Sequence, residues 1–447
     1  MINKYKGSLI YSAIGDSLGW ITEFVRNKEE LNKKYGMDEI DSFISWGKNV
    51  GGRFYGYKDT INAGSYSDDT QLMLAVARSI ALDKDVDQDY FGKVELANWI
   101  YYARGAGATI KNAARKIKRK NASWNNNFFN YTLGKKKLNY KDSGANGAAM
   151  RVLPIALANI DNIGNAFRNT TSNAIITHGH PTAIIGACLY SLSIHINAQY
   201  KLDNFNPVDY LVQLGNAYKE HIKPSLLKEP ALDRWLEKWN SEGEYHFDEL
   251  FKKSYEIGLK GLRDIYNSVN SSKSENEVLD TLGCFNKATK GSGIATVLAG
   301  IYFYCKNYHS PFEGMVKAVN MIGTDTDSIA GFYGGLIGLL HGNDTLESKF
   351  KSLQDYHYIE TIADQLYQIS ISKSDYEPPT INDGDLNDIK EDNFNINQNI
   401  TFNPLGEGII TGIDRQDTLV EGKYNLILNA DFNIGQTCVF SKIFSHV

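Results

Sequence analysis

The sequence lacks the features that mark membrane-spanning and secreted proteins. No run of apolar residues approaches the roughly 18 that a membrane-spanning helix requires. The N-terminal apolar stretch from Leu9 to Ile14 is too short for the core of a signal peptide, and it leads directly into Asp16. We therefore expect a soluble, cytoplasmic protein with no membrane partner.

Cysteine and net charge are also low. The chain has 447 residues, a formal net charge of -5 and a pI near 6.0. This balance gives no global reason to expect a nucleic-acid partner, and we expect a globular, enzyme-sized monomer. The four cysteines show no Cys-x-x-Cys spacing, so neither a disulfide framework nor a zinc site is indicated: Cys188, Cys284, Cys305 and Cys438.

Two clusters of carboxylates and hydroxyls stand out, far apart in the sequence. Ser67 to Thr70 follow a polar, glycine-bearing stretch (residues 46–64), which we interpret as a loop, and precede an apolar helical pattern. Asp325 to Ser328 lie between two further apolar helical patterns. Ligand sets made only of oxygen suit hard divalent cations. We therefore predict that the two clusters are the two halves of one metal centre.

The first cluster has a local interpretation as well. Ser67 is predicted to cap a helix whose first turn holds Asp68 and Asp69. Acids in a first turn often do no more than complement the helix dipole. Adjacent helical residues point roughly 100° apart, so these two carboxylates serve two neighbouring ions more easily than one. That geometry favours a dinuclear centre.

Residues 7–24 predict a buried helix, with Gly15 and Gly19 allowing close approach of another segment. We place Asp16 and Glu23 at the end of this helix. Exposed acids at a helix C-terminus are the plain alternative, and the other acidic clusters favour a functional role.

A glycine-rich turn, residues 143–151, leads into another apolar run. Amides freed by Gly144 and Gly147 at a helix start can receive a diphosphate, although a simple helix entry explains the pattern equally well. Further on, His178 and His180 either ligate a metal as a pair or belong to a capping turn that presents one imidazole to a ligand.

A basic segment follows the first acidic cluster. Residues 111–120 and 135–137 are rich in Lys and Arg and flank an Asn-rich, aromatic stretch. Basic and aromatic residues together can bind nucleic acid. We favour a solvated helix face followed by a loop, because acids elsewhere counter the positive charge.

Composition divides the chain into three parts. Strand patterns are scarce before residue 370, and residues 200–280 are amphipathic, so the body is predicted to be all-α. Residues 371–401 are rich in Asn and Asp, contain Pro378 and Pro379, and read as a linker. Glycines punctuate short β-prone runs in residues 402–447, which predicts a small β module.

Taken together, five blocks in this order resemble the ADP-ribosylglycohydrolase family, which includes the dinitrogenase reductase activating glycohydrolase. The resemblance covers roughly residues 5–365 and leaves the tail unexplained. It implies an all-α, orthogonal multi-helix bundle with two Mg²⁺ or Mn²⁺ ions that cleaves ADP-ribose from a modified protein or small molecule. The blocks are Gly15 to Gly19 with Glu23, Ser67 to Thr70, Asn146 to Arg151, Thr177 to Pro181, and Asp325 to Ser328.

The resemblance also implies a role for each matched residue. Glu23 would activate or position water as the catalytic residue, and His178 would contact a ribose. The residues implied to bind substrate at the diphosphate turn are Ser143, Gly144, Asn146, Gly147 and Met150. The implied metal ligands are Ser67, Asp68, Asp69, Asp325, Asp327 and Ser328.

Three positions are compared with the residues usual in the family. Thr324 stands where a second glycine is common, which would narrow the pocket beside the metals. Ser328 replaces the commoner threonine and keeps the oxygen ligand, and Ser67 occupies a position that is serine or threonine in the family.

Two other classes are compatible with parts of the sequence. Asp325 to Ser328 resemble the Asp-x-Asp nucleophile of haloacid-dehalogenase phosphatases, but that motif follows a buried strand, and the residues before Asp325 fit a helix better. A non-catalytic relative that keeps the fold is the other alternative. Such a protein has no need of a complete acidic set together with Glu23, so we expect an active hydrolase.

Overall fold

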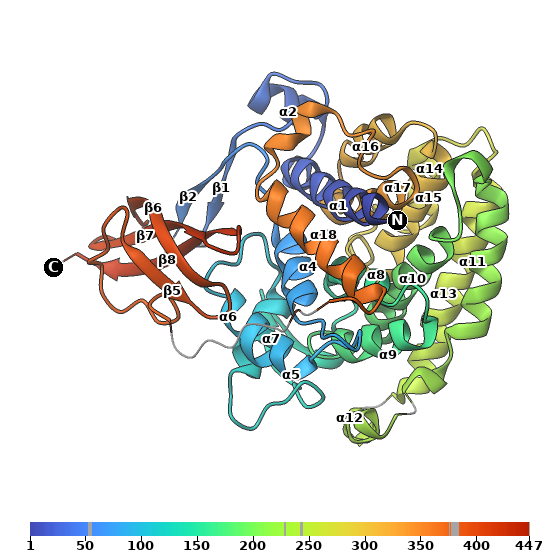
Figure 1. Cartoon of the computed structure of the whole chain (residues 1–447), viewed down its shortest axis with the longest axis horizontal. Helices are drawn as coiled ribbons and strands as arrows, with labels where there is room; N and C mark the ends of the chain where they lie inside the picture. The colour runs from blue at the N-terminus through green and yellow to red at the C-terminus, as the bar shows by residue number, and fades with distance from the viewer. Residues whose placement is uncertain (52–55, 228, 242–244, 375, 377–383, 447) are drawn as a thin grey trace.

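A computed structural model describes residues 1–51, 56–227, 229–241, 245–374, 376 and 384–446. The chain forms a large helical body and, at the left of Figure 1, a small sheet from the C-terminal residues. The predicted all-α body and the predicted β module are both confirmed. No helix in the described ranges has the length and apolar character needed to cross a membrane.

The body consists mainly of helices. They are α1 (Ile2–Glu23), α2 (Lys28–Tyr35), α4 (Asp68–Arg78), α5 (Gln88–Tyr90), α6 (Ala97–Trp99), α7 (Ala108–Ile117), α8 (Leu153–Ala158), α9 (Ile163–Ala174), α10 (Pro181–Asn197), α11 (Pro207–His221), α12 (Pro230–Ser241), α13 (Phe247–Ser268), α14 (Glu275–Thr281), α15 (Gly293–Asn307), α16 (Pro311–Val319), α17 (Thr326–His341) and α18 (Tyr356–Ser370). A π-helical turn, η1 (Phe91–Leu96), joins α5 to α6.

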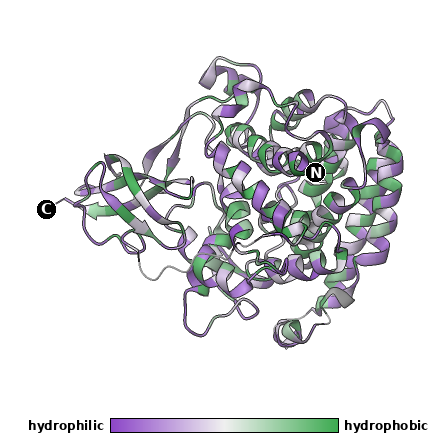
Figure 2. Ribbon diagram, viewed as in Figure 1, coloured by the Kyte–Doolittle hydropathy of each residue, from purple (hydrophilic) through white to green (hydrophobic). Residues whose placement is uncertain are grey.

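Short 3-10 turns complete the body. They are η2 (Tyr140–Asp142), η3 (Asn146–Arg151), η4 (Leu202–Asn204), η5 (Pro224–Leu227) and η6 (Ser348–Ser352). The amphipathic pattern predicted for residues 200–280 forms α11 to α14, and the ribbons of α11 and α13 carry bands of both polar and apolar colour in Figure 2.

Helices α1 and α17 lie side by side near the centre of the body (Figure 1). Their glycines allow the two backbones to touch: a Cβ on Gly19 would lie 2.5 Å from the carbonyl oxygen of Thr326. A side chain at Gly19 would push the helices apart. This contact brings the acids of α1 next to the second acidic cluster, at the start of α17.

Two hairpins interrupt the helical body. β1 (Trp46–Val50) pairs with β2 (Tyr57–Ile61), and β3 (Asn130–Leu133) pairs with β4 (Lys136–Asn139), both antiparallel. The interpretation of residues 46–64 as a loop is therefore wrong over both strands. Trp46 and Ile61 face each other in register and are buried, and this apolar pair anchors the hairpin to the body.

The C-terminal sheet has four antiparallel strands in the order β5-β6-β7-β8. They are β5 (Asn399–Phe402), β6 (Gly406–Asp417), β7 (Lys423–Phe432) and β8 (Thr437–Ser445). Phe402, Phe432 and Phe440 are buried, and Phe444 is partly buried. Burying these rings gives the small sheet an apolar core.

The sheet packs directly on the helical body. The ring of Tyr102 lies 5.8 Å from that of Phe402 and 6.0 Å from that of Phe440, measured between centroids. The amide of Thr437 donates to the carboxylate of Asp355 at the start of α18, at 3.0 Å. These contacts favour a packed extension of the body over a freely tethered module.

Part of the predicted linker also contacts the protein. Leu386 and Ile389 are buried within the hydrophobic core. Pro378 and Pro379, on which the linker interpretation relied, lie outside the described residues. The three-domain division with boundaries at 370 and 401 stays a prediction.

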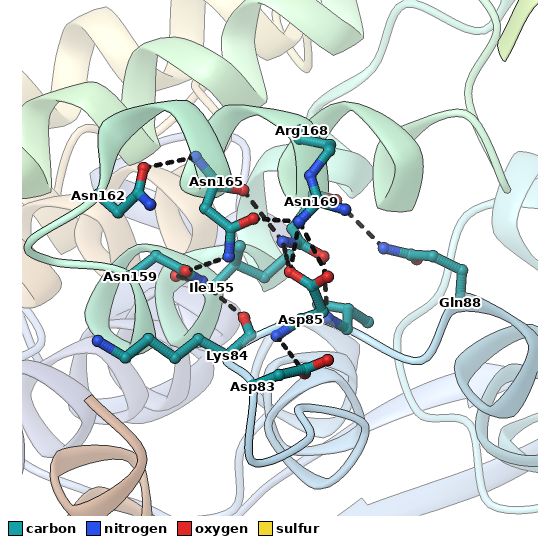
Figure 3. A network of polar contacts seen from close by, with 11 residues as sticks. Asp83, Lys84, Asp85, Gln88, Ile155, Asn159, Asn162, Asn165, Arg168 and Asn169 are labelled. Carbon is teal, nitrogen blue, oxygen red and sulfur yellow. Dashed lines mark hydrogen bonds and ion pairs between the residues drawn. The ribbon is translucent and has the colours of Figure 1, made fainter. Parts of the chain in front are cut away.

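The loop after α4 is held against α9 by a polar network (Figure 3). The amide of Val86 donates to Asn169 at 2.8 Å, and the guanidinium of Arg168 donates to Asp85 at 2.7 Å. The side chain of Asn159 donates to the carbonyl of Lys84 at 2.9 Å. These bonds fix the C-terminal end of α4, whose N-terminal end carries the first acidic cluster.

Candidate active site

The two acidic clusters meet in the structure. The hydroxyl of Ser328, on α17, donates to the carboxylate of Asp69, on α4, at 2.7 Å. Asp68, Asp327 and Ser328 are buried, and Asp69 is partly buried. Residues more than two hundred positions apart in the sequence therefore form one site.

Ser67 caps α4, as its position before the apolar run predicts. Its hydroxyl accepts a hydrogen bond from the amide of Asp69 at 3.1 Å. This places Asp68 and Asp69 in the first turn, where the free amides and the helix dipole stabilise negative charge.

Asp16 organises the start of α4. Its carboxylate accepts from the amide of Ser67 at 3.1 Å, from the amide of Thr70 at 3.0 Å and from the hydroxyl of Thr70 at 2.6 Å. The prediction that Asp16 lies at a helix end is wrong, because α1 continues to Glu23. The signal that marks Asp16 is an acid in the interior of an apolar helix, where only a paired charge is tolerated.

Negative charge is concentrated around this site. Burial, then the neighbouring Asp16, raises the pKa of Asp68 to about 7. Burial raises the pKa of Asp325 to about 6, with Glu23 adding to the rise. Burial and then Asp327 raise the pKa of Asp69 well above its usual value. Such crowding disfavours the ionised carboxylates unless positive charge is added.

Glu23 lies at the rim of the acidic cluster, at the C-terminal end of α1. Burial raises its pKa well above the usual value, and Asp327 and Asp68 raise it further. Lys48 and Lys290 act in the opposite direction. A carboxylate in this state holds a proton more strongly than a free glutamate does, which suits a general base.

The glycine-rich turn pairs with a second glycine-bearing segment. The amide of Asn146 donates to the carbonyl of Gly291 at 2.9 Å, and the amide of Gly293 donates to the carbonyl of Gly144 at 3.1 Å. The side-chain amide of Asn146 also points at Asp325, at 3.4 Å. Residues 291–293, which the sequence analysis missed, therefore build the site together with the turn.

These bonds limit which amides of the turn can hold an anion. The amides of Ser143, Gly144 and Asn146 already donate to backbone carbonyls. Ala145 and Gly147 are thus the remaining candidates for the predicted diphosphate contact. Ser143, Gly144 and Ser292 line a cavity of about 440 Å³ here, a volume in the usual range of small-molecule sites.

His178 packs against the glycine-rich turn, whereas His180 caps a helix. A Cβ on Gly147 would lie 2.8 Å from Cε1 of His178. The Nδ1 of His178 is 2.7 Å from the hydroxyl of Thr177, and burial lowers the pKa of the imidazole to about 3, so it is neutral. His180 caps α10 by accepting from the amide of Thr182 at 3.1 Å. This arrangement matches a capping turn.

The remaining predicted residue, Met150, is buried in η3. It lines a small cavity together with Asp16, Asp69 and Ser328. Met150 therefore supplies an apolar wall to the acidic cluster.

The donor set is suited to a hard cation. Carboxylates and hydroxyls are the ligands that Mg²⁺ and Mn²⁺ prefer, and a cation would relieve the crowding described above. Within the described ranges, no three His, Cys, Asp or Glu side chains converge on one point as ready-made ligands. Hydroxyls and water would complete any coordination shell, and the six ligands named from the sequence stay a prediction.

The fold and this site define a helical domain built around a buried acidic centre. The family model for ADP-ribosylglycohydrolases matches residues 1–375. The chain belongs to that family, whose members are glycohydrolases that act on ADP-ribosylated substrates. Strands β5 to β8 lie beyond the matched range.

The chain is also similar to individual proteins. ADP-ribosylhydrolase ARH3 of Xenopus tropicalis is 23% identical over 82% of this chain and 96% of its own length. The ADP-ribosyl-[dinitrogen reductase] glycohydrolase of Rhodospirillum rubrum is 31% identical over 41% of this chain and 53% of its own. A solved ADP-ribosylglycohydrolase-related protein complex matches with a TM-score of 0.51 and 17% identity, covering 83% of this chain and 98% of that one, which shows the fold alone.

Proposed function

We propose that the protein is a metal-dependent hydrolase that releases ADP-ribose from a modified acceptor, which reverses mono-ADP-ribosylation. One observation carries this proposal above all: the acidic clusters of α4 and α17 meet beside a cavity of about 440 Å³. The side chain of Asn146 links the two, because the residue belongs to the cavity's turn and points at Asp325.

The residues of the chain would divide the work between binding and proton transfer. The amides of Ala145 and Gly147 would hold the diphosphate, and neutral His178 beneath them would contact a ribose. Glu23 would accept a proton from the attacking water. Its carboxylate would also stabilise the oxocarbenium-like state through which glycosidic bonds break.

Two divalent ions would be held at the acidic centre. The ligands we propose are Ser67, Asp68, Asp69, Asp325, Asp327 and Ser328. Bound ions would orient the ribose hydroxyls and lower the pKa of water.

A non-catalytic ADP-ribose-binding relative is the alternative. It would keep the cavity but would have no use for the crowded carboxylates, whose burial is unfavourable without a compensating charge. The raised pKa values of Asp68 and Asp325 therefore support a working hydrolytic centre.

The test is to incubate the protein with mono-ADP-ribosylated arginine and serine peptides, with Mg²⁺ and with a chelator. We expect free ADP-ribose to appear only with Mg²⁺. Binding of ADP-ribose without release from any substrate would favour the non-catalytic alternative.

A further inference from the structure

A second recess lies on the other side of the acidic centre, between the body and the C-terminal sheet. It has a volume of about 450 Å³ and is lined by the β1–β2 hairpin, residues 103–105, the start of α7 and strands β7 and β8. Its basic lining residues are Lys48, Arg104, Lys111 and Lys442. The proposed function makes no use of this recess.

Gly105 lines the recess and also lies against the acidic centre. A Cβ on Gly105, at a φ of +93°, would lie 2.7 Å from a carboxylate oxygen of Asp68. The ADP-ribose cavity instead reaches the centre through Gly291, where a Cβ would lie 2.9 Å from a carboxylate oxygen of Asp325. The recess thus reaches the acidic centre next to Asp68, and the ADP-ribose cavity reaches it next to Asp325. This arrangement suits a substrate whose ADP-ribose lies in one cavity and whose acceptor lies in the other.

Lys48 connects the recess to Glu23. Its ammonium lies 4.1 Å from the ring centroid of Trp20, and its charge acts on both Glu23 and Asp68. Burial lowers the pKa of Lys48 to about 8, so it still carries its charge at pH 7. A group in the recess would therefore lie close to the proposed catalytic carboxylate.

Positive charge exceeds negative charge on the described lining. Asp59 is the acidic lining residue, and Arg104 already pairs with it at 2.8 Å. Lys442 lies 3.8 Å from Asp388, in a pair exposed enough to contribute little. Lys48 and Lys111 act electrostatically on Asp68 across the backbone, but neither forms an ion pair within the described residues. Together with Lys442 they are the ammonium groups of the lining that an anion could meet.

These charges favour one class of acceptor. A phosphate monoester carries a charge of about −1.5 to −2 near pH 7, which three ammonium groups can match. An arginine acceptor would bring another positive charge among the three ammonium groups. Repulsion between like charges would weaken its binding relative to an anionic acceptor. A long nucleic acid is disfavoured, because the chain as a whole is negative, at -5, and the basic residues gather in one recess.

We propose that this recess receives the acceptor and selects a phosphorylated protein segment over one that carries arginine at the modified position. The inference rests on the proposed function and adds the acceptor class. Lys442 comes from β8, beyond the range that the family model matches, so the C-terminal sheet gives this chain its selectivity.

Binding measurements on the full-length protein test the proposal. Three fluorescent peptides of one sequence carry phosphoserine, serine or arginine at the central position, and they are titrated with Mg²⁺ and saturating ADP-ribose present. We expect the phosphopeptide to bind about tenfold more tightly than the serine peptide, with the arginine peptide weakest. Lys442→Gln should lower the affinity for the phosphopeptide severalfold.

Lys390→Gln is the matched control, because its ammonium also lies near Asp388, at 3.6 Å, but does not line the recess. It should bind the phosphopeptide as the wild type does. Equal affinities for the three peptides, or an unchanged affinity in Lys442→Gln, would overturn the proposal. Stronger competition by uridine monophosphate than by the phosphopeptide would overturn the protein class of the acceptor.

Failure of the proposed function would appear in a different measurement. In that case no mono-ADP-ribosylated peptide releases ADP-ribose with Mg²⁺, whereas the order of affinities of the three unmodified peptides is read without any turnover. A phosphopeptide preference without release would keep the anion selectivity and refute the hydrolase.

Discussion

The two ends of α4 carry buried charge in opposite ways. At its C-terminal end Arg78 donates to both carboxylate oxygens of Glu95, at 2.7 and 2.8 Å, and to the side-chain oxygen of Gln436 at 2.6 Å. At its N-terminal end Asp68 and Asp69 face other carboxylates. A buried charge that only supports the fold is usually paired with an opposite charge. The N-terminal end of α4, where Asp68 and Asp69 face like charges, is called the unpaired end, and this crowding indicates a functional role.

The same helix also joins the two regions of the molecule. Gln436 lies in the turn between strands β7 and β8, so the paired end of α4 anchors the C-terminal sheet to the body. The unpaired end lies against α1 and α17. Stability and chemistry are thus separated along one helix of 11 residues.

The largest expected effect is on turnover, at the unpaired end. Glu23→Gln removes the proposed general base, and loss of such a group costs ~10²–10⁴ in rate. Metal and ADP-ribose binding should stay nearly normal, because Glu23 is not among the proposed ligands. Single-turnover release of ADP-ribose, with calorimetry as the control, measures both. A wild-type rate would make Glu23 only a helix-end acid.

The next largest expected effect is on stability, at the C-terminal end of α4, where Arg78 pairs with Glu95. Arg78→Met leaves Glu95 buried without its partner, which should cost ~3–5 kcal/mol of unfolding free energy in a urea titration. The double variant Arg78→Met with Glu95→Gln should recover part of that loss, because the unpaired charge is gone. If the single and double variants are equally stable, the pair does not act as described.

The sequence predicts the two ends of α4 unequally. The acidic end is visible because Ser67 caps a helix with Asp68 and Asp69 in its first turn, a local pattern that the structure confirms. The Arg78 pair is not visible, because its partners lie 17 and 358 residues away and only the folded chain brings them together.

The same reasoning explains other successes and failures. The helical body follows from hydrophobic periodicity, a local property. The hairpin at residues 46–61 was missed because its buried anchors, Trp46 and Ile61, are separated by a stretch that is mostly polar residues and glycine. Residues 291–293 were missed because their role comes from pairing with a turn 145 or more positions earlier.

A smaller effect should appear at the cavity proposed to bind ADP-ribose, away from both ends of α4. A valine at Gly147 would press on Ile110 and His178. Overpacking of this size should raise the dissociation constant of ADP-ribose roughly tenfold, with Mg²⁺ binding unchanged. Calorimetry with each ligand measures both.

Gly215→Val is the control for that experiment, because a Cβ there meets no atom within 4 Å. It should leave ADP-ribose affinity at the wild-type value. Equal affinity in Gly147→Val as well would relocate the pocket.

The central claim is that the unpaired end of α4 is a cation site, held at a cost to the metal-free fold. Thermal unfolding of the wild type and of Asp68→Asn, with and without Mg²⁺, tests it directly. Mg²⁺ should raise the melting temperature of the wild type, since a ligand of the native state stabilises it. Asp68→Asn should melt higher than the wild type without Mg²⁺, because one crowded charge is removed, and should gain little when Mg²⁺ is added. A variant that melts lower than the wild type without Mg²⁺, and gains as much from it, would contradict the account.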